Sequence, residues 1–197
     1  MENTFLPLIF RMKHINRWSL MHNTQQEDLM QHTIECAFIT NYLATIGNCY
    51  FGKNHDINKL TVCAMFHDIT EVLTGDLPTP IKYFNDDIKN IYSKIEDMAT
   101  EKLKKHLPAD IIPYYDNYMN KAKLSVEEGT LIKAADKLCA YIKCIHELNA
   151  GNKEFQHAHA RIKVVLKSYD CEELRYFLDN CVDAFSFSLY DLKGTLD

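Results

Sequence analysis

The sequence predicts an all-α fold, and three of its features lead to this prediction. The chain has 197 residues but only six glycines and five prolines, so it has few of the residues that form turns between short elements. No segment alternates apolar and polar residues with the β-branched richness that is typical of strands. Apolar residues recur instead at helical spacing. The hydrophobic share of 47% and the charged share of 25% are those of a globular domain.

The N-terminal quarter is expected to contain two helices with an irregular segment between them. A short amphipathic helix covers 5–13, with an apolar face that begins at Phe5. The irregular segment, 15–24, carries Trp18, the one tryptophan of the chain. The second helix runs over about 28–46, where apolar residues again follow the helical period.

A third helix is expected over about 58–73. Its first turns are apolar on every side, so we expect it to be the central, buried helix. The following segment, 74–83, contains Gly75, Pro78 and Pro80. These residues exclude regular helix, so this segment is predicted to be a loop.

The remainder of the chain is expected to form four more helices, over about 86–106, 125–151, 153–168 and 171–188. Pro108 and Pro113 mark a break after the first of them. Ser125 and Glu128 form the Ser-x-x-Glu pattern of a capping box, which marks the start of the second. No repeat or linker divides the chain, so we predict one domain over 1–197 with about six to eight helices.

Charge and cysteine content limit the function. The formal net charge is −5, which disfavours binding to a nucleic-acid polymer or to a membrane surface. The seven cysteines never form a Cys-x-x-Cys pair, which favours reduced thiols in a cytoplasmic protein. No segment has the apolar length needed to span a bilayer, and the N-terminus lacks the features of a signal peptide.

Polar residues interrupt the apolar third helix. His67 and Asp68 follow its apolar turns, and Glu71 would project to the same side of a continuous helix. A buried Asp beside a His requires a partner, and a borderline divalent cation such as Mn²⁺, Co²⁺, Fe²⁺ or Zn²⁺ would satisfy both. A hydrogen-bonded core pair is the alternative. The second His-Asp pair, His55 and Asp56, precedes a helix, so we expect it at the surface, with Asp56 as the N-cap.

Two more polar residues lie on helix faces that should be apolar. His32 begins the apolar face of the second helix, and Asp136 lies in the middle of the fifth. Lys133, three residues back, is an alternative partner for Asp136. Together with His67 and Asp68, these residues supply two imidazoles and two carboxylates. Four such ligands leave coordination positions open, as in a catalytic metal site.

The order His32, His67-Asp68, Asp136 resembles the signature of the HD-domain metal-dependent phosphohydrolases. Segments 15–21, 67–84 and 133–141 are similar to the YfbR-like 5′-deoxynucleotidases, and the likeness covers nearly the whole chain. The central block of eighteen residues, 67–84, is the most specific part. Ser19 stands where close relatives are expected to have proline, which puts the packing of the preceding Arg17-Trp18 segment in doubt.

The resemblance implies a dimeric, all-α HD-domain bundle that removes phosphate from deoxyribonucleoside 5′-monophosphates. It implies one divalent cation, such as cobalt or manganese, held by His32, His67, Asp68 and Asp136. His32, Asp68 and Asp136 would also contact substrate. The remaining roles are phosphate orientation by Arg17, sugar contact by Trp18, acid–base catalysis by Glu71, and substrate contact by Asp76, Leu77, Pro78 and Thr79.

Four less specific interpretations remain open. The protein could be another HD phosphohydrolase, acting on nucleoside triphosphates, alarmones or cyclic nucleotides, although the short chain argues against this. It could be a non-catalytic helical binding module that a metal stabilises, although Glu71 and Asp76 disfavour this. Trp18 could be an ordinary core aromatic residue, and Arg17 could belong to a surface ion pair.

Overall fold

A computed structural model describes residues 3–82 and 84–194, with the side chains of Thr79 and Pro80 excepted. In this part of the chain the regular elements are all helical, which confirms the all-α prediction. The helices are α1 (Phe5–Ile9), α2 (Leu29–Tyr50), α3 (Ile57–Met65), α4 (Glu71–Thr74), α5 (Thr79–Lys82), α6 (Asp86–Lys104), α7 (Ile112–Met119), α8 (Val126–Asn149), α9 (Gln156–Ser168), α10 (Glu172–Asn180) and α11 (Leu189–Lys193). Their number exceeds the prediction because several are single turns.

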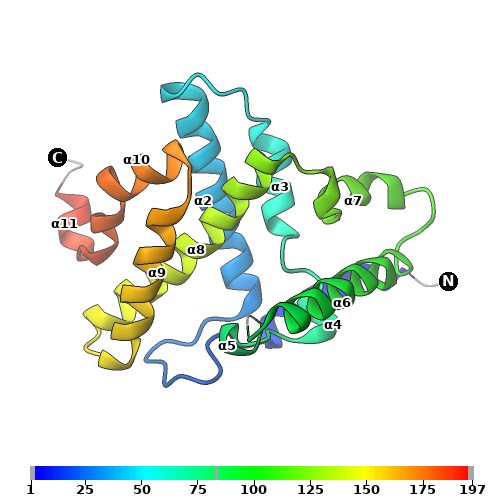
Figure 1. Ribbon diagram of the computed structural model, residues 1–197, viewed down its shortest axis with the longest axis horizontal. Helices are drawn as coiled ribbons and strands as arrows, with labels where there is room; N and C mark the ends of the chain where they lie inside the picture. Colours follow the sequence, from blue (N-terminus) through cyan, green and yellow to red (C-terminus); the bar gives the residue numbers. More distant parts are fainter. Residues whose placement is uncertain (1–2, 83, 195–197) are drawn as a thin grey trace.

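The two longest helices, α2 and α8, form the centre of the main core. They cross in the middle of Figure 1, where α3 and α10 lie against α2, and α9 lies against α8. Leu43 of α2 and Leu138 of α8 are completely buried in this core. The prediction that the third helix is the central one is therefore wrong. Leu60 of α3 is fully buried, but Met65 at its end is 38% exposed, so α3 is not enclosed on every side.

A second, smaller core lies under α1, α6 and α7. Phe5, Leu103 and Met119 pack there against Ile69, which is 2% exposed and lies between α3 and α4. The sequence did not indicate α7, because Pro113 was interpreted as a break. Proline fits the first turn of a helix, where its missing N–H has no intrahelical partner, and Pro113 lies there. This core supports the short segment that carries His67 and Asp68.

The expected helix over 58–73 is broken. The structure ends α3 at Met65 and begins α4 at Glu71, with turns between them. Backbone bonds from Ile69 N to Phe66 O (3.2 Å) and from Glu71 N to Asp68 O (3.0 Å) hold these turns. The sequence spacing predicted that Glu71 and His67 share one helix. In the structure Glu71 begins α4, and His67 lies in the turns before it.

The other boundaries differ from prediction in smaller ways. The expected loop over 74–83 contains the single turn α5, since Pro80 is tolerated in the first turn of a helix. The expected helix over 171–188 ends at Asn180 and continues as a 3₁₀ turn, Val182–Ser186. The capping box of Ser125 and Glu128 at the start of α8 is confirmed in both directions.

The cysteines and helix lengths agree with the sequence analysis. All seven cysteines are free, and Cys36, Cys63, Cys139 and Cys144 are buried, as expected for reduced core thiols. In the described residues, no helix has both the length and the apolar character that crossing a membrane would require.

Candidate metal centre and substrate site

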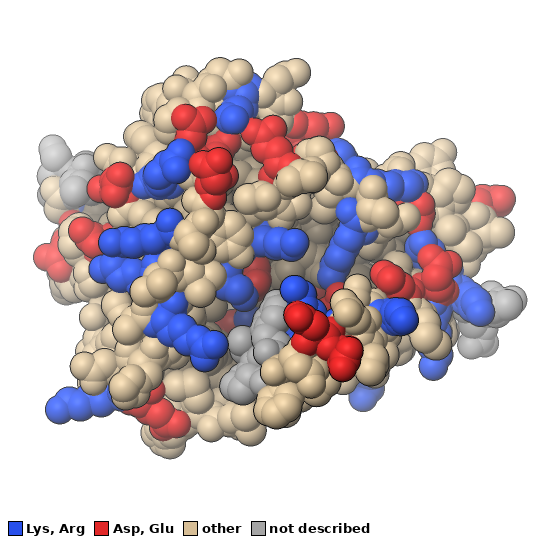
Figure 2. Space-filling model, viewed as in Figure 1, with Lys and Arg blue, Asp and Glu red and all other residues tan. Residues whose placement is uncertain are grey.

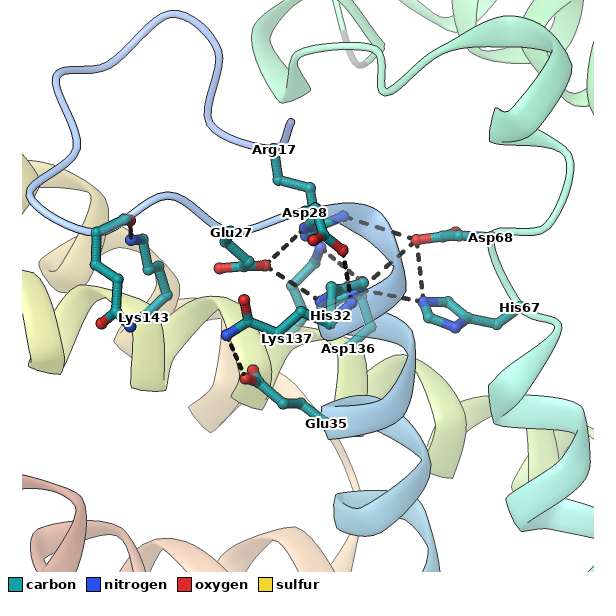
Figure 3. A network of polar contacts seen from close by, with 12 residues as sticks. Arg17, Glu27, Asp28, His32, Glu35, His67, Asp68, Asp136, Lys137 and Lys143 are labelled. Atoms are coloured by element: carbon teal, nitrogen blue, oxygen red, sulfur yellow. Dashed lines mark hydrogen bonds and ion pairs between the residues drawn. The ribbon is translucent and has the colours of Figure 1, made fainter. Parts of the chain in front are cut away.

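Four candidate ligand side chains from three parts of the chain converge at one point. His32 comes from the first turn of α2, His67 and Asp68 from the turns after α3, and Asp136 from the middle of α8 (Figure 3). His32 Nε2 lies 3.3 Å from His67 Nε2 and 3.4 Å from Asp136 Oδ1. Asp68 Oδ2 lies 3.0 Å from His67 Nε2 and 3.7 Å from His32 Nε2. One ligand atom of each residue lies within 4.8 Å of all the others.

The orientation of both imidazoles leaves Nε2 facing the centre of this cluster. His67 Nδ1 lies 2.7 Å from the carbonyl oxygen of Ala64, so Nδ1 carries a proton and Nε2 is the nitrogen that faces the cluster. His32 is completely buried, and its Nδ1 points away from the cluster, toward Glu27. The side chains of Asp68 and Asp136 are 16% and 24% exposed, so the cluster is open on the carboxylate side.

The electrostatics of the cluster favour positive charge at its centre. Burial alone would raise the pKa of Asp68, but the adjacent His67 and His32 hold it well below its usual range. Burial opposes the charged form of Asp136 too, and Lys137 and His32 lower its pKa all the same. For His67 the burial effect is outweighed by Asp68 and Cys36, and its pKa is raised well above the ordinary value.

This donor set fits a divalent metal ion. Two neutral imidazole nitrogens and two carboxylate oxygens are the ligands that borderline cations take, and fewer than six positions would be filled. The buried Nδ1 of His32 has no hydrogen-bond partner within bonding distance in the described residues, which is consistent with a ring oriented for its Nε2 contact. Asp136 pairs with Lys137 (3.1 Å) and not with Lys133, the alternative partner that the sequence had suggested.

Arg17 lies next to the cluster and is not a surface residue. Its side chain is 12% exposed, its Nε donates to Glu27 Oε1 at 2.9 Å, and Nη1 lies 3.8 Å from Asp68 Oδ2. Burial would lower the pKa of Arg17, but Asp136, Glu27 and Asp68 raise it, so the guanidinium stays charged. A planar cation beside a candidate metal site is suited to hold two oxygens of a phosphate group.

Trp18 has an unusual backbone conformation for a bulky residue. Its φ is 57°, and its ring packs on the fully buried Phe155 with 5.2 Å between centroids. Such a conformation costs of order 1–3 kcal/mol and persists only where the surroundings fix it. The indole is half-buried, and its Nε1 has no hydrogen-bond partner in the described residues. Trp18 therefore packs on the core at Phe155 and is not fully buried there.

The loop that follows Trp18 is fastened to α8 by one buried carboxylate. Glu147 is 1% exposed and accepts hydrogen bonds from Thr24 N (2.9 Å), Thr24 Oγ1 (2.7 Å) and Gln25 N (3.2 Å). Lys143 Nζ and Asn152 Nδ2 add two more, at 2.6 Å and 2.8 Å. The same helix carries Asp136, so α8 supports both this candidate metal ligand and the loop of Arg17 and Trp18.

Glu71 and Asp76 form the acidic side of the site. Glu71 is 4% exposed, and its Oε2 is buried without a hydrogen-bond partner in the described residues. Burial, together with the charges of Asp68 and Asp76, raises the pKa of Glu71 to about 8. Burial also raises the pKa of Asp76. Lys82 contributes an opposing charge, and Glu96 holds it at 3.0 Å.

The expected substrate loop lies beside these residues in part. Asp76, Leu77 and Pro78 are half-buried, and the charges of Asp76 and Arg17 affect each other's pKa. The side chain of Thr79 lies outside the described residues. An apolar groove of about 400 Å³ adjoins Leu77; it is lined by Thr74, Leu77, Ile88, Ile91, Tyr92 and Ile95.

Several Lys and Arg side chains, with Asp and Glu among them, lie around a hollow near the middle of the face shown in Figure 2. The net charge of −5 therefore hides a local basic region on this face, which suits an anionic ligand. Figures 1 and 2 share one view, and the hollow of Figure 2 lies where Figure 1 shows the end of α3 facing α6.

The structure brings together residues that sequence reasoning missed or misplaced. The sequence analysis did not single out Glu27 or Glu147, which are 4% and 1% exposed in the structure. Glu147 binds Thr24 across 123 residues, so no local sequence pattern shows this partner. Glu27 is only ten residues from Arg17 and five from His32, but no regular spacing relates the three residues, because the chain turns between them. His55, expected at the surface, is 9% exposed and lies 3.0 Å from Glu173 Oε1. Asp56 does cap α3, as predicted.

The similarity of this chain to known proteins extends over nearly its whole length. Residues 4–185 match the family model described as 5′-deoxynucleotidase YfbR-like. The chain is 42% identical over 189 residues to a 5′-deoxynucleotidase of Photorhabdus laumondii, covering 96% of each protein. It is 40% identical over 192 residues to the 5′-deoxynucleotidase YfbR of Escherichia coli O1:K1, covering 98% of this chain and 96% of the relative.

Solved structures agree on the fold. An HD-domain phosphohydrolase from Listeria innocua superposes with a TM-score of 0.80 at 20% identity, covering 92% of this chain and 88% of the other. The cyanophage S-2L HD phosphohydrolase DatZ, solved with dA and one catalytic Zn²⁺, gives a TM-score of 0.63 at 16% identity, covering 90% and 95%. With the family match over most of its length, the chain belongs to the YfbR-like 5′-deoxynucleotidase family.

Proposed function

We propose that the protein is a metal-dependent 5′-deoxynucleotidase that hydrolyses deoxyribonucleoside 5′-monophosphates to deoxyribonucleosides and phosphate. The observation that carries the proposal is the convergence of His32, His67, Asp68 and Asp136 beside the buried Arg17. Curated relatives at about 40% identity carry this activity in their names. The arrangement combines a cation site with a phosphate clamp in the same small space.

The four ligands would hold one divalent cation, for example Co²⁺ or Mn²⁺. When bound, such a cation lowers the pKa of a coordinated water and polarises a phosphoryl oxygen. The guanidinium of Arg17 holds two other phosphate oxygens and orients the phosphorus for attack from the side of the cluster. Positioning of this kind supplies much of the rate enhancement in phosphoryl transfer.

The leaving group of the reaction is the 5′-oxygen of the deoxyribonucleoside, which needs a proton as the P–O bond breaks. Burial and the charges of Asp68 and Asp76 raise the pKa of Glu71, so its protonated form is available near neutral pH and can donate that proton. We propose that Trp18 lines the sugar and that Asp76, Leu77, Pro78 and Thr79 contact the substrate. His32, Asp68 and Asp136 would face the phosphate as well as the cation.

The test of this function is phosphate release from matched deoxyribose and ribose 5′-monophosphates. The protein is first treated with chelator and then resupplied with Mn²⁺ or Co²⁺. Release that needs the cation and is largely confined to the deoxy series supports the proposal. No release from folded, metal-loaded protein contradicts it, and triphosphates, alarmones and cyclic nucleotides are then the next substrates to assay.

The role of Glu71 predicts a specific pH dependence. The protonated form is lost as pH rises through the pKa of about 8, and a bound cation shifts that pKa downward. We therefore expect kcat/KM to fall on the alkaline side with a midpoint at or below pH 8. Glu71→Gln should lower kcat about a hundred-fold and remove this alkaline limb. The measurement is the pH–rate profile of both proteins, with Glu172→Gln as control; an unchanged limb in Glu71→Gln refutes the assignment.

Trp18 is expected to determine sugar selectivity. A rigid ring against the 2′ carbon leaves a ribose hydroxyl without space or a hydrogen-bond partner. Replacing Trp18 with Ala should reduce the ratio of kcat/KM for deoxyribose over ribose substrates by about ten-fold or more. Steady-state kinetics on a matched nucleotide pair measures this ratio, and Tyr114→Ala, which alters a 71% exposed aromatic residue, is the control. The same ratio in Trp18→Ala and wild type would disprove the idea.

We further propose that the enzyme works in the cytoplasm as a homodimer. Seven free cysteines are consistent with a reducing compartment. Ile34, Phe38 and Tyr42 follow one another at four-residue spacing on α2 and are 40%, 72% and 49% exposed. Burial of such an apolar stripe against a second copy would stabilise a dimer. Light scattering across a concentration series decides between monomer and dimer.

A further inference from the structure

Glu27 is a buried acid at the edge of the site for which the proposed reaction has no role so far. It precedes Asp28, the N-cap of α2, and it is 4% exposed. Burying a carboxylate is costly unless charged or hydrogen-bonding groups compensate it. The side-chain partners that the structure gives Glu27 are Arg17 and His32, and both belong to the proposed catalytic machinery.

Glu27 holds Arg17 by two hydrogen bonds, one to its main chain and one to its guanidinium. The Arg17 backbone N donates to the Glu27 carbonyl oxygen at 2.9 Å, and Arg17 Nε donates to Glu27 Oε1, also at 2.9 Å. Bonding at Nε leaves the terminal nitrogens of the fork available for a ligand. The carboxylate therefore aims the guanidinium without occupying the end that would hold phosphate.

The contact with His32 involves the same carboxylate oxygen. His32 Nε2 faces Asp68 and Asp136, and its other nitrogen, Nδ1, lies 3.6 Å from Glu27 Oε1. When Nε2 offers its lone pair to a cation, Nδ1 must carry the proton and needs an acceptor. A closer approach of about half an ångström would bring this pair to hydrogen-bond distance. Figure 3 shows Glu27 between Arg17 and His32.

We propose that Glu27 is a positioning residue that couples the metal ligand His32 to the phosphate-binding Arg17 through one carboxylate oxygen. The inference rests on the proposed function and adds a second layer to its site. Because one oxygen serves both partners, loss of the carboxylate should weaken the binding of a cation and of a phosphate together. A residue that serves the fold alone would affect neither affinity specifically.

The experiment measures two affinities that need no turnover. Calorimetry gives the Kd of Mn²⁺ for the metal-free protein and the Kd of inorganic phosphate for the Mn²⁺-loaded protein. Glu27→Ala should weaken Mn²⁺ binding about 10–100-fold, the usual cost of losing such an outer ligand, and phosphate binding about ten-fold. Glu27→Gln, which keeps size and one acceptor oxygen, should show smaller losses in both. Glu35→Gln, on α2 with its side chain bonded to Gln31, should match wild type.

A double variant separates positioning from general damage. In an Arg17→Ala background, Glu27→Gln should no longer weaken phosphate binding, because the group that it aims is gone, but it should still weaken Mn²⁺ binding through His32. Thermal melting of each variant checks that it is folded. If Glu27→Ala does not fold, the two affinities are compared between Glu27→Gln and wild type. Wild-type affinities in folded Glu27→Gln, or loss of only one affinity, would overturn the coupling.

Failure of the proposed function would look different. If wild-type protein binds Mn²⁺ and phosphate but releases no phosphate from deoxyribonucleoside monophosphates, the function is wrong, and the two affinities still judge the coupling. If wild type is active and Glu27→Ala binds both ligands normally, the function stands and the coupling is wrong.

Discussion

Replacing Asp68 with Ala is expected to lower phosphate release about a thousand-fold or more and to weaken divalent-cation binding strongly. Asp68 Oδ2 is the oxygen that lies near both imidazoles, at 3.0 Å from His67 Nε2 and 3.7 Å from His32 Nε2. Removing it deletes one of the four proposed ligands and one of the two negative charges that favour a cation there. A metal ion contributes several kcal/mol to such a transition state, and each 1.36 kcal/mol is a factor of ten in rate.

The measurement is kcat with saturating Mn²⁺, together with the Kd of Mn²⁺ by calorimetry. Asp68→Asn keeps the shape of the side chain and should also be strongly impaired, which separates loss of charge from loss of packing. Asp110→Ala changes an exposed aspartate away from the site and should behave as wild type. Full activity in folded Asp68→Ala would refute the assignment of the metal centre.

Replacing Arg17 with Ala should reduce kcat/KM about a hundred-fold or more. Hydrogen bonds to charged groups contribute about 1.5–3 kcal/mol each, and the fork of Arg17 can make two to phosphate. Because the guanidinium is held by Glu27 at 2.9 Å, little order has to be gained when substrate binds. Arg17→Lys keeps a charge but not the planar fork, so it should recover only part of the loss.

Steady-state kinetics and the inhibition constant of inorganic phosphate measure the loss. Arg175→Ala is the matched control, because that side chain is 58% exposed and pairs only weakly, at 3.5 Å, with Asp170. Wild-type phosphate affinity in Arg17→Ala would show that the guanidinium does not hold the substrate, whatever the effect on kcat.

Local patterns predicted the long helices well. The capping-box pattern of Ser125 and Glu128 predicted the start of α8 correctly, because such a cap depends only on residues three positions apart. The pattern failed at Phe66–Thr70, where a run of helix-compatible residues forms turns. Tertiary packing decides that break: Ile69 inserts into the small core of Phe5 and Leu103. No window of local sequence contains those partners.

The candidate site divides in the same way. The sequence alone indicated four residues of the site, because a polar residue on an apolar helix face is visible in the sequence pattern. These residues are His32, His67, Asp68 and Asp136, and the structure brings them together. Glu27 was not found, because a glutamate beside a helix N-cap looks like surface charge. Its role is visible only when Arg17 and His32 are placed around it.

The attachment of the Trp18 loop to α8 has a consequence for how activity arises during folding. Thr24 and Glu147 are 123 residues apart in sequence, and Asn152 Nδ2 reaches the carbonyl oxygen of His22 across 130 residues. Helices form in about a microsecond from local contacts, whereas contacts of high sequence separation wait for loop closure. Refolding protein should therefore regain its helical circular dichroism before its catalytic competence, because the loop of Arg17 and Trp18 is held by contacts between distant parts of the chain.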